Sequence, residues 1–508
     1  MAAMPDFAGF AEAYETGAAQ LVRTVLVGDL ETPVSAFLKL RAAHPQHAFL
    51  LESVEGGAVR GRYSMIGLAP DLVWRCQGGM AEINRTALSD PDAFQPCPGA
   101  PLEALRSLLA ESAIPSTPAG LPPMAAGVFG YLGYDMVRHM ERLGPPNPDA
   151  LGVPDAVLVR PTVMVVFDAV RDEMVVVSPV RPRPGTVARA AYAAAQERID
   201  AVVAALDAPL THPGGPAPAG LVAQAAVSNT APEAYKAMVA RAKEYIRAGD
   251  IFQVVLSQRF EAPFALPAFA LYRALRRVNP APFLCFLDFG GFQIVCSSPE
   301  ILVRVRDGTV TIRPIAGTRP RGADAAADKA LGEELLADEK ERSEHLMLLD
   351  LGRNDVGRVS KTGTVTVTDS FFLERYSQVM HIVSNVEGQL DDTSHDALGA
   401  LVAGFPAGTV SGAPKVRAMQ IIDELESEKR GIYAGCIGYF GASGEMDTCI
   451  VLRTAVVKDG RMYVQAGAGI VHDSDPDSEQ AECVNKAKAL FRAAEEAVRF
   501  ASAAGRGQ

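Results

Sequence analysis

Short runs of β-branched and aromatic residues, separated by turns rich in Gly, Pro and Asp, recur along this chain and limit the folds open to it. Residues 157–166 and 173–177 form one such pair in the first half. Residues 252–260, 283–289 and 292–296 continue the pattern in the second half. Because strands joined by short turns pair antiparallel, and because helical stretches interrupt them, we predict an α+β fold with a mostly antiparallel sheet.

Helix and turn signals punctuate these strands. Residues 187–205 have apolar residues at helical spacing. Thr230 and Glu233 have the spacing of a capping box, and Gly249 is a helix terminator, so we predict a helix between them. The tetrapeptide at residues 458–461 contains Asp-Gly and predicts a β-hairpin turn.

Two stretches rich in Pro, Gly and Ala suggest how the chain is divided. They are residues 115–123 and residues 208–220, and the second follows the predicted helix. A chain of 508 residues exceeds one ordinary core. We therefore predict two large domains, 1–220 and 221–508.

Charge and composition exclude several classes of protein. The formal net charge is −12 and no long basic run occurs, which argues against binding to nucleic acid. No run of about 18 apolar residues and no leader-like N-terminus occurs, so we expect a cytoplasmic protein without membrane attachment. Seven cysteines without CxxC spacing predict core thiols in a reduced compartment rather than disulfides or zinc.

Two carboxylates stand at polar-to-apolar transitions of predicted helices. Glu344 lies in an acidic segment that runs into Leu346 and the following leucines, and Glu482 lies on a helix predicted to start near Pro476. Carboxylates from separate helices can bind a hard cation such as Mg²⁺. Spacing alone favours the alternative, in which both are solvated helix charges and Glu482 pairs with Lys486.

Four further features leave binding and structural interpretations open. The loop 312–322 carries three Arg residues, which suits carboxylate binding or a basic surface loop. The glycines in 465–470 permit close approach of a ligand, although a bulge is the commoner reason for them. Arg453 lies inside an apolar strand predicted over 449–457 and must meet a carboxylate or face solvent. His381 lies in a strand-like run, where a hydrogen-bonded core histidine is more common than a catalyst.

Ordered motifs carry more information than spacing does, and none of the common nucleotide-binding or hydrolase motifs is among them. The motifs occupy residues 49–53, 61–64, 250–257, 297–300, 314–321, 343–355, 406–415 and 467–469. Together they closely resemble the chorismate-utilising enzymes and, within that family, the large subunits (component I) of the anthranilate synthases. The resemblance covers essentially the whole second half and extends into the first.

The resemblance implies an antiparallel β-sandwich core with peripheral helices around a deep substrate cleft. It implies a regulatory, glutaminase-contacting domain in 1–220 and a chorismate-binding catalytic domain in 221–508. By the same resemblance, the Mg²⁺ ligands are Glu344 and Glu482. The implied substrate contacts are Gly317, Thr318, Tyr433, Arg453, Gly467, Ala468 and Gly469.

The implied catalytic residues are Glu300, His381 and Thr409. Glu300 is placed to protonate the departing C4 hydroxyl of chorismate, and His381 lies near the C2 centre that later loses a proton. Water-adding relatives carry Lys at the position of Gln253, and relatives that make 4-amino-4-deoxychorismate carry Lys at that of Ala316. Both residues therefore favour direct attack of ammonia at C2, followed by loss of pyruvate to give anthranilate, the first committed step of tryptophan biosynthesis.

The resemblance also implies partners. The chain has no glutaminase segment, so ammonia is expected from a separate glutamine amidotransferase subunit in a hetero-oligomer, a heterotetramer in the family pattern. Tryptophan is expected to inhibit from a site lined by Glu52, Ser53, Pro282, Phe283 and Leu284, although a strand edge plus a Pro-rich turn also explains these residues. Phe283 and Leu284 stand where Tyr and Met are usual.

Three other functions remain to be weighed. Two are enzymes of the same family: an aminodeoxychorismate synthase, and an isochorismate or salicylate synthase. The third is a tryptophan-binding regulatory protein without catalysis, against which stands the presence of Glu300, Glu344, Glu482, His381 and Arg453.

Overall fold

A computed structural model of the chain describes residues 3–44, 46–55, 59–115, 117–118, 120–210, 225–376 and 379–504. The predicted domain boundary near Gly220 lies outside the described residues. The elements of the first half are α1 (Phe7–Glu15), β1 (Gln20–Val27), α2 (Pro33–Arg41), β2 (Phe49–Glu55), β3 (Val59–Gln77), β4 (Met80–Asn84), β5 (Gln95–Pro96), α3 (Pro101–Ser112), η1 (Pro123–Ala125), β6 (Gly127–Leu132), η2 (Tyr134–His139), β7 (Ala156–Asp168), β8 (Glu173–Val180) and α4 (Ala188–Asp207).

The second half begins with β9 (Val227–Ser228) and ends in the long helix α11. Its elements are β9, α5 (Pro232–Ala248), β10 (Gln253–Pro263), α6 (Ala268–Val278), β11 (Phe283–Asp288), β12 (Gln293–Ser298), β13 (Ile301–Arg306), β14 (Thr309–Ile312), β15 (Ile315–Pro320), α7 (Ala325–Ala337), α8 (Glu339–Gly357), β16 (Thr366–Arg375), β17 (Val379–Gln389), α9 (Ala397–Gly404), η3 (Gly408–Val410), β18 (Gly412–Ala413), α10 (Lys415–Leu425), β19 (Cys436–Gly441), β20 (Met446–Ile450), β21 (Thr454–Lys458), β22 (Arg461–Ile470) and α11 (Pro476–Ala504).

The strands of the two halves belong to one hydrogen-bonded network. Strand β2 pairs with β11, so that Ser53 lies opposite Phe283 and Glu52 opposite Leu284. Strand β6 pairs with β19 in the same way. These pairings are antiparallel, as are the hairpins β11–β12 and β21–β22. Sheet hydrogen bonds therefore join the first half directly to the second.

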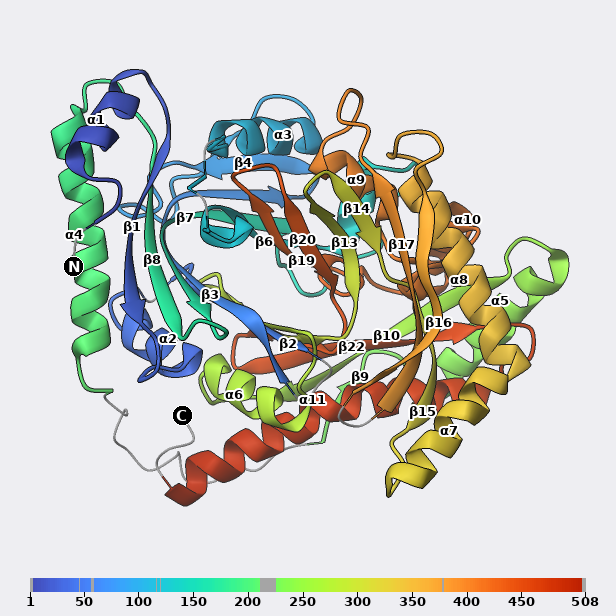
Figure 1. Cartoon of the computed structure of the whole chain (residues 1–508). Helices are drawn as coiled ribbons and strands as arrows, with labels where there is room; N and C mark the ends of the chain where they lie inside the picture. Colours follow the sequence, from blue (N-terminus) through green and yellow to red (C-terminus); the bar gives the residue numbers. More distant parts are fainter. Residues whose placement is uncertain are drawn as a thin grey trace.

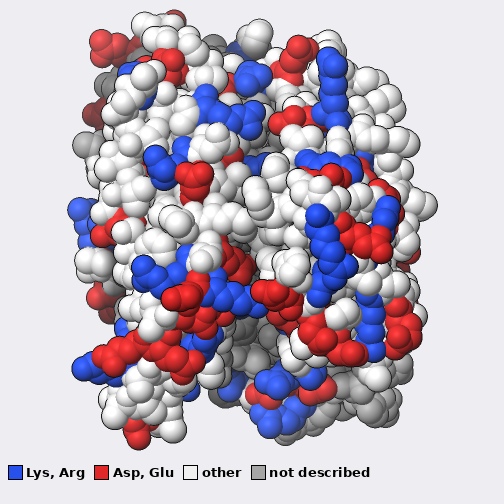
Figure 2. Space-filling view, turned by 90° about the vertical axis from the view of Figure 1, so that its right-hand side faces the viewer, with Lys and Arg blue, Asp and Glu red and all other residues white. Residues whose placement is uncertain are grey.

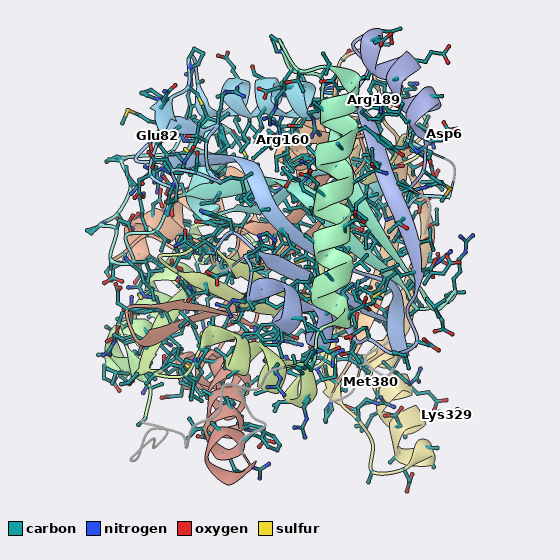
Figure 3. All side chains as sticks on the ribbon, turned by 90° about the vertical axis from the view of Figure 1, so that its left-hand side faces the viewer. Asp6, Glu82, Arg160, Arg189, Lys329 and Met380 are labelled. Atoms are coloured by element: carbon teal, nitrogen blue, oxygen red, sulfur yellow. The ribbon has the colours of Figure 1, made fainter. Side chains whose placement is uncertain are left out.

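Helices lie on the outside of the sheet layers (Figure 1). On one side, α1 and α4 cover β1 and β8, and α4 is seen face-on in Figure 3. On the opposite side, α7 and α8 pack on β15 and β17. Helix α11 runs along the lower edge in Figure 1 and packs on α6 and β22. The predicted α+β fold, with an antiparallel sandwich core and peripheral helices, is confirmed.

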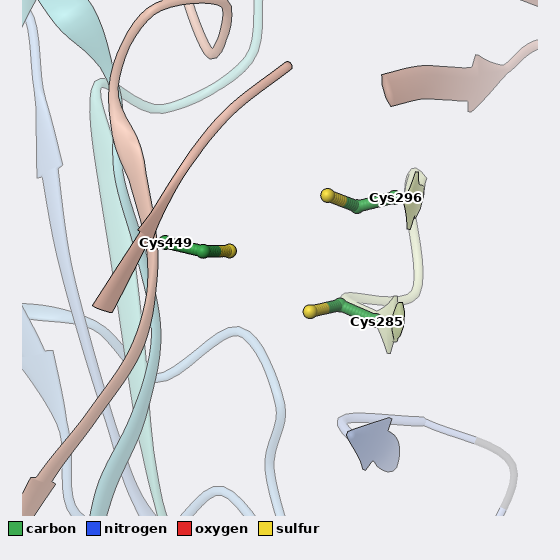
Figure 4. Close-up of side chains that lie close together, drawn as sticks. All are labelled: Cys285, Cys296 and Cys449. Carbon is green, nitrogen blue, oxygen red and sulfur yellow. The ribbon is translucent and has the colours of Figure 1, made fainter. Parts of the chain in front are cut away.

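A central apolar core fills the space between the strand layers. It includes the thiols of Cys285, Cys296 and Cys449, which come from β11, β12 and β20. Cys449 points across the core toward the other two, which lie opposite each other in the β11–β12 hairpin (Figure 4). All seven cysteines are free, and six of them are buried.

Most of the predicted elements occur at the expected places. The hairpin at 458–461 has positive φ at Asp459 (50°) and Gly460 (71°), as its Asp-Gly sequence predicts. Gly249 ends α5 in the left-handed conformation with φ 83°. The predicted capping box at Thr230 is wrong: Ala231 is the N-cap, without a side-chain cap, because Pro232 starts the helix.

The surface agrees with the exclusion of a broad basic face. On the side shown in Figure 2, Lys and Arg side chains are interspersed with Asp and Glu. Among the described residues, every helix is too short or too polar to span a membrane.

Candidate active site

Glu300 follows β12 and has a carboxyl group that is poised to give up a proton. The hydroxyl of Thr409 donates to Glu300 Oε2 at 3.1 Å, and the Ile450 amide donates to the Glu300 carbonyl at 3.0 Å. Burial raises the pKa of Glu300 to about 7, although Thr409 and the charge of Arg453 act in the opposite direction. A pocket opens against Glu300 and Thr409. Glu300 can therefore act as a general acid near neutral pH.

Arg453 lies in the turn between β20 and β21, with φ 49°, and not inside a strand as predicted. The strand breaks because Leu452 bonds back to Ile450, and this turns the Arg453 side chain toward Glu300 and Tyr376. Burial lowers the pKa of Arg453, and the charges of those two groups partly restore it. Across the described residues, no carboxylate forms an ion pair with Arg453, so its guanidinium is available to an anionic ligand.

The Gly317–Thr318 segment and His381 form a second part of the site. Strand β15 has a bulge at Gly317 (φ 71°), where a side chain would also crowd Glu341. His381 Nδ1 lies 2.9 Å from the Gly317 carbonyl and 3.1 Å from Thr318 Oγ1. Since a carbonyl only accepts, the proton is assigned to Nδ1, which leaves the lone pair on Nε2. Burial lowers the pKa of His381 to about 4, so the ring stays neutral.

Two glycines of β22 let the backbone approach its neighbours closely. A Cβ at Gly467 would lie 2.9 Å from the Tyr433 hydroxyl, and one at Gly469 would lie 2.6 Å from Gln253 Nε2. Both glycines lie within β22, which runs to Ile470. Ala468 is fully buried, so neither its side chain nor its backbone is exposed in this structure. The glycines are required for packing as well as for any ligand contact.

Glu344 and Glu482 converge from α8 and α11. Burial raises the pKa of Glu344, and the nearby charges of Glu341 and Glu482 raise it further. Gln253 Nε2 donates to Glu344 Oε1 at 3.0 Å. The ion pair of Glu482 with Lys486, the alternative that spacing favoured, is present at 2.7 Å. Glu482 therefore pairs with Lys486 and also lies close enough to Glu344 to influence its pKa.

Glu344 and Glu482 offer the oxygen ligands that a hard divalent cation prefers. Their oxygens are carboxylate oxygens, and the mutual repulsion that raises the pKa of Glu344 is the kind that a cation relieves. Two protein ligands leave coordination positions for substrate and water. Elsewhere among the described residues, Cys285, Cys296 and Cys449 bring three thiols within 4.8 Å, but soft sulfur does not suit Mg²⁺.

Lys486 is a site residue whose wider role the sequence did not reveal. Besides the ion pair with Glu482, its Nζ donates to the Gly467 carbonyl at 2.9 Å. Its charge also lowers the pKa of Glu300 and that of His381. The i, i+4 spacing on α11 gave the Glu482 contact, but only the fold brings this helix against β22.

The predicted effector residues lie in a separate cluster on β2 and β11. Glu52 is buried, and its carboxylate accepts from Tyr272 Oη at 2.5 Å. Arg276 adds two bonds, from Nε at 2.6 Å and from Nη2 at 2.9 Å. Ser53, Phe283 and Leu284 are brought beside Glu52 by the β2–β11 pairing, and Pro282 immediately precedes β11.

Comparison of the sequence with known families and proteins gives consistent matches. The family described as chorismate binding enzyme matches residues 32–492. Anthranilate synthase component 1 of Cereibacter sphaeroides is 59% identical over 506 residues, which are 99% of this chain and 100% of that protein. The protein of the same name from Pseudomonas putida is 49% identical and covers 92% of this chain and 93% of its own length.

Solved structures give the same fold. Anthranilate synthase component I from Streptococcus pneumoniae superposes with a TM-score of 0.73 at 37% identity, covering 92% of this chain and 99% of its own. The menaquinone-specific isochorismate synthase from Escherichia coli superposes with a TM-score of 0.69 at 19% identity, covering 96% of this chain and 100% of its own. The second likeness concerns the fold alone.

Proposed function

The chain belongs to the family of chorismate-binding enzymes, and from this premise we propose that it converts chorismate and ammonia to anthranilate, pyruvate and water in tryptophan biosynthesis. The observation that carries the proposal is Glu300: a carboxyl with a pKa of about 7, bonded to Thr409 and close to Arg453, which forms no ion pair with the residues that the structure describes. The names of the relatives at 59% and 49% identity support the choice of reaction. In this proposal the enzyme is a carbon–oxygen lyase.

The first step joins ammonia to C2 of chorismate. As the C2–N bond forms, both ring double bonds shift by one position and the C4–O bond breaks. Glu300 gives its proton to the departing oxygen, so that water leaves, and the ammonium group formed at C2 releases a proton to solvent. Hydroxide is a poor leaving group, which is why the raised pKa of Glu300 matters. Arg453 and Tyr433 hold the enolpyruvyl carboxylate during this step.

The second step removes pyruvate and makes the ring aromatic. His381 Nε2 takes the proton from C2 while the C3–O bond breaks. The leaving group departs as enolpyruvate, which takes up a proton on carbon and becomes pyruvate. With a pKa of about 4, His381 is a weak base, so this step depends on the free energy gained by aromatisation. Gly317 and Thr318 fix the ring orientation of His381 through Nδ1.

The residues around C2 suit ammonia better than water. Gln253 cannot take a proton from water, and its amide is already bonded to Glu344. Ala316 on β15 offers no amine that could attack the ring. These two positions argue against the isochorismate, salicylate and aminodeoxychorismate alternatives.

A bound Mg²⁺ is part of the proposal. Glu344 and Glu482 would hold it, and its charge would neutralise the ring carboxylate of chorismate. Ammonia would come from a glutamine amidotransferase subunit in a hetero-oligomer, and the component 1 names of the relatives support a partner component. Tryptophan would inhibit from the Glu52 cluster, where a buried carboxylate can receive its ammonium group.

The proposal is tested with the purified chain, chorismate, Mg²⁺ and an ammonium salt at mildly alkaline pH, which frees ammonia. We expect anthranilate, followed by its fluorescence and mass, and an equal amount of pyruvate. Glutamine should not replace ammonium for the chain alone, and Glu482→Ala should abolish product. Isochorismate or aminodeoxychorismate as product would assign the sister reactions, and no turnover with intact tryptophan binding would favour the regulatory protein.

A further inference from the structure

Glu426, which follows the last turn of α10, and Arg430 form an ion pair that solvent barely reaches. Arg430 is 2% exposed and Glu426 is 7% exposed. Arg430 donates from Nη2 to Glu426 Oε1 at 2.6 Å and from Nε to Oε2 at 3.0 Å. A buried ion pair is weak evidence for stability, because desolvation offsets the attraction. Its contacts indicate what else it does.

The guanidinium of Arg430 joins two backbone segments that carry site residues. Its Nη1 donates to the Val410 carbonyl at 2.7 Å, and Val410 directly follows Thr409. Its Nη2 also donates to the Val255 carbonyl of β10 at 2.6 Å. The turn that presents Thr409 to Glu300 is thus tied to β10 through one side chain.

The carboxylate of Glu426 continues this connection to the glycine strand. Its Oε1 accepts from the Ser257 amide at 2.8 Å and from the Ser257 hydroxyl at 2.9 Å. In the β10–β22 register, Ser257 lies opposite Gly467 and Val255 lies opposite Gly469. The ion pair therefore fixes β10 at the two positions that face the site glycines.

Aromatic rings enclose the remaining face of the guanidinium. The Arg430 Cζ lies 4.9 Å from the Tyr134 ring centroid and 5.6 Å from that of Tyr433. Tyr433 is one of the implied substrate contacts, and its hydroxyl lies close to Gly467. The pair thus touches each of three segments: the Thr409 turn, β10 and Tyr433.

We propose that the Glu426–Arg430 pair is a positioning device for the reaction, which holds Thr409 against Glu300 while keeping Tyr433 and the Gly467–Gly469 backbone in place. The inference rests on the proposed function, because it assumes that Glu300 is the acid. Arg430 and Glu426 act through the groups that they hold, and we assign them no contact with chorismate.

The chemistry of the pair suits arginine and not lysine. A planar guanidinium can serve a carboxylate and two carbonyls at fixed angles, whereas an ammonium group has three donors on a flexible stem. Arg430→Lys keeps the positive charge but cannot reach both oxygens of Glu426 and both carbonyls at once. The variant separates geometry from charge.

The first test compares steady-state rates with chorismate and ammonium. In Arg430→Lys, kcat should fall about 30- to 100-fold, with KM changed less than about 3-fold, because a misplacement of about 1 Å costs on the order of 100-fold in rate. The matched control is Arg160→Lys. Arg160, labelled in Figure 3, is 6% exposed, bonds Asp71 with two nitrogens at 2.8 and 3.0 Å, and lies in the other half. Its kcat should stay within about 2-fold of the wild-type value.

The second test follows the protonation of Glu300 itself. The bond from Thr409 lowers the pKa of Glu300. Loss of the Glu426–Arg430 pair should therefore raise that pKa and move the alkaline limb of kcat/KM to higher pH. Thr409→Val should cause the same movement. Arg430→Lys combined with Thr409→Val should move the limb no further than either change alone, and Arg160→Lys should leave it unmoved.

Isotope-edited infrared titration of the Glu300 carboxyl, assigned by its loss in Glu300→Gln, reads the same pKa without turnover. If the wild type makes no anthranilate, the proposed function fails, while this titration still tests whether the Glu426–Arg430 pair positions Thr409. An upward shift in Arg430→Lys that matches Thr409→Val supports the inference. An unshifted carboxyl, or a rate loss as large in Arg160→Lys, overturns it. Glu426→Gln repeats the test from the other side of the pair.

Discussion

Two carboxyl groups of this molecule, those of Glu52 and Glu300, have opposite surroundings. Glu52 accepts three hydrogen bonds, one from Tyr272 and two from Arg276, so its charge is compensated within the protein. Glu300 accepts one side-chain bond, from Thr409, and burial raises its pKa to about 7. The nearby Arg453 forms no ion pair with any of the described residues. The charge of Glu52 is therefore balanced by its own neighbours, whereas Glu300 and Arg453 have few partners.

The difference teaches what each cluster is suited to do. A carboxylate with satisfied partners can exchange one of them for an incoming ammonium group. A carboxyl with few partners retains a proton that it can transfer. Strand β11 lies between the two: Phe283 pairs with Ser53 on one side and with Ser298, two residues before Glu300, on the other.

The largest expected effect comes from removing the proton donor. In Glu300→Gln, kcat should fall about 10³- to 10⁴-fold, within the range that a general acid contributes. The side chain keeps its size and can still accept from Thr409. The wild-type kcat/KM, expressed per unprotonated ammonia, should be level below pH 7 and fall above it, because the acid must be protonated. A Gln variant that retains more than a tenth of the rate would contradict this role.

The same substitution should stabilise the protein while it inactivates it. A pKa that rises from 4.5 to about 7 on folding corresponds to roughly 3 kcal/mol. The unfolded chain releases this proton first, so the native state loses stability as pH rises from about 4.5 to 7. Glu300→Gln should therefore exceed the wild-type free energy of unfolding by up to about 3 kcal/mol at pH 8 and by little at pH 4.5. Urea unfolding at both pH values measures this, and a difference independent of pH would contradict it.

The sequence predicted elements well where local signals coincide with the fold. The hairpin at 458–461 and the end of α5 at Gly249 are set by residues that tolerate positive φ, so neighbours in sequence suffice. It failed at Arg453, which an apolar stretch placed inside a strand although the chain turns there. That turn depends on the path from β20 to β21, which is a tertiary constraint.

The site residues also divide into those that the local sequence signals and those that only the tertiary structure brings together. Glu344 and Glu482 were candidates by helix spacing, but only a resemblance of ordered motifs selected them over solvated helix charges. The second contact of Lys486, to the Gly467 carbonyl, and the Glu426–Arg430 pair were missed, because each joins segments far apart in sequence. A buried Arg such as Arg430 gives no periodic signal within its own segment.

A smaller effect is expected at the proposed cation site, where Glu482 raises the pKa of Glu344 although Glu482 also pairs with Lys486. Glu482→Gln should raise the Mg²⁺ concentration for half-maximal rate at least about 10-fold, because half of the protein charge on the ion is lost. The control is Glu496→Gln on the same helix, where Glu496 pairs with Arg499 at the surface. Titration of the rate with Mg²⁺ measures both, and equal curves for the two variants would remove Glu482 from the site.

The smallest effect on turnover is expected at the compensated cluster, because Glu52 lies apart from the active site. If tryptophan binds at this cluster, its ammonium group adds one charge-assisted bond to Glu52, and such a bond contributes about 1.5–3 kcal/mol, or roughly 10- to 100-fold in affinity. Glu52→Gln should raise the tryptophan concentration for half-inhibition by at least about 10-fold and leave kcat within about 2-fold. Asp288→Asn is the matched control, since Asp288 is equally buried on β11 and bonds Arg41 at 2.7 Å. Inhibition weakened equally in both variants would mean that loss of a buried ion pair at the β2–β11 sheet, and not a ligand contact, explains the result.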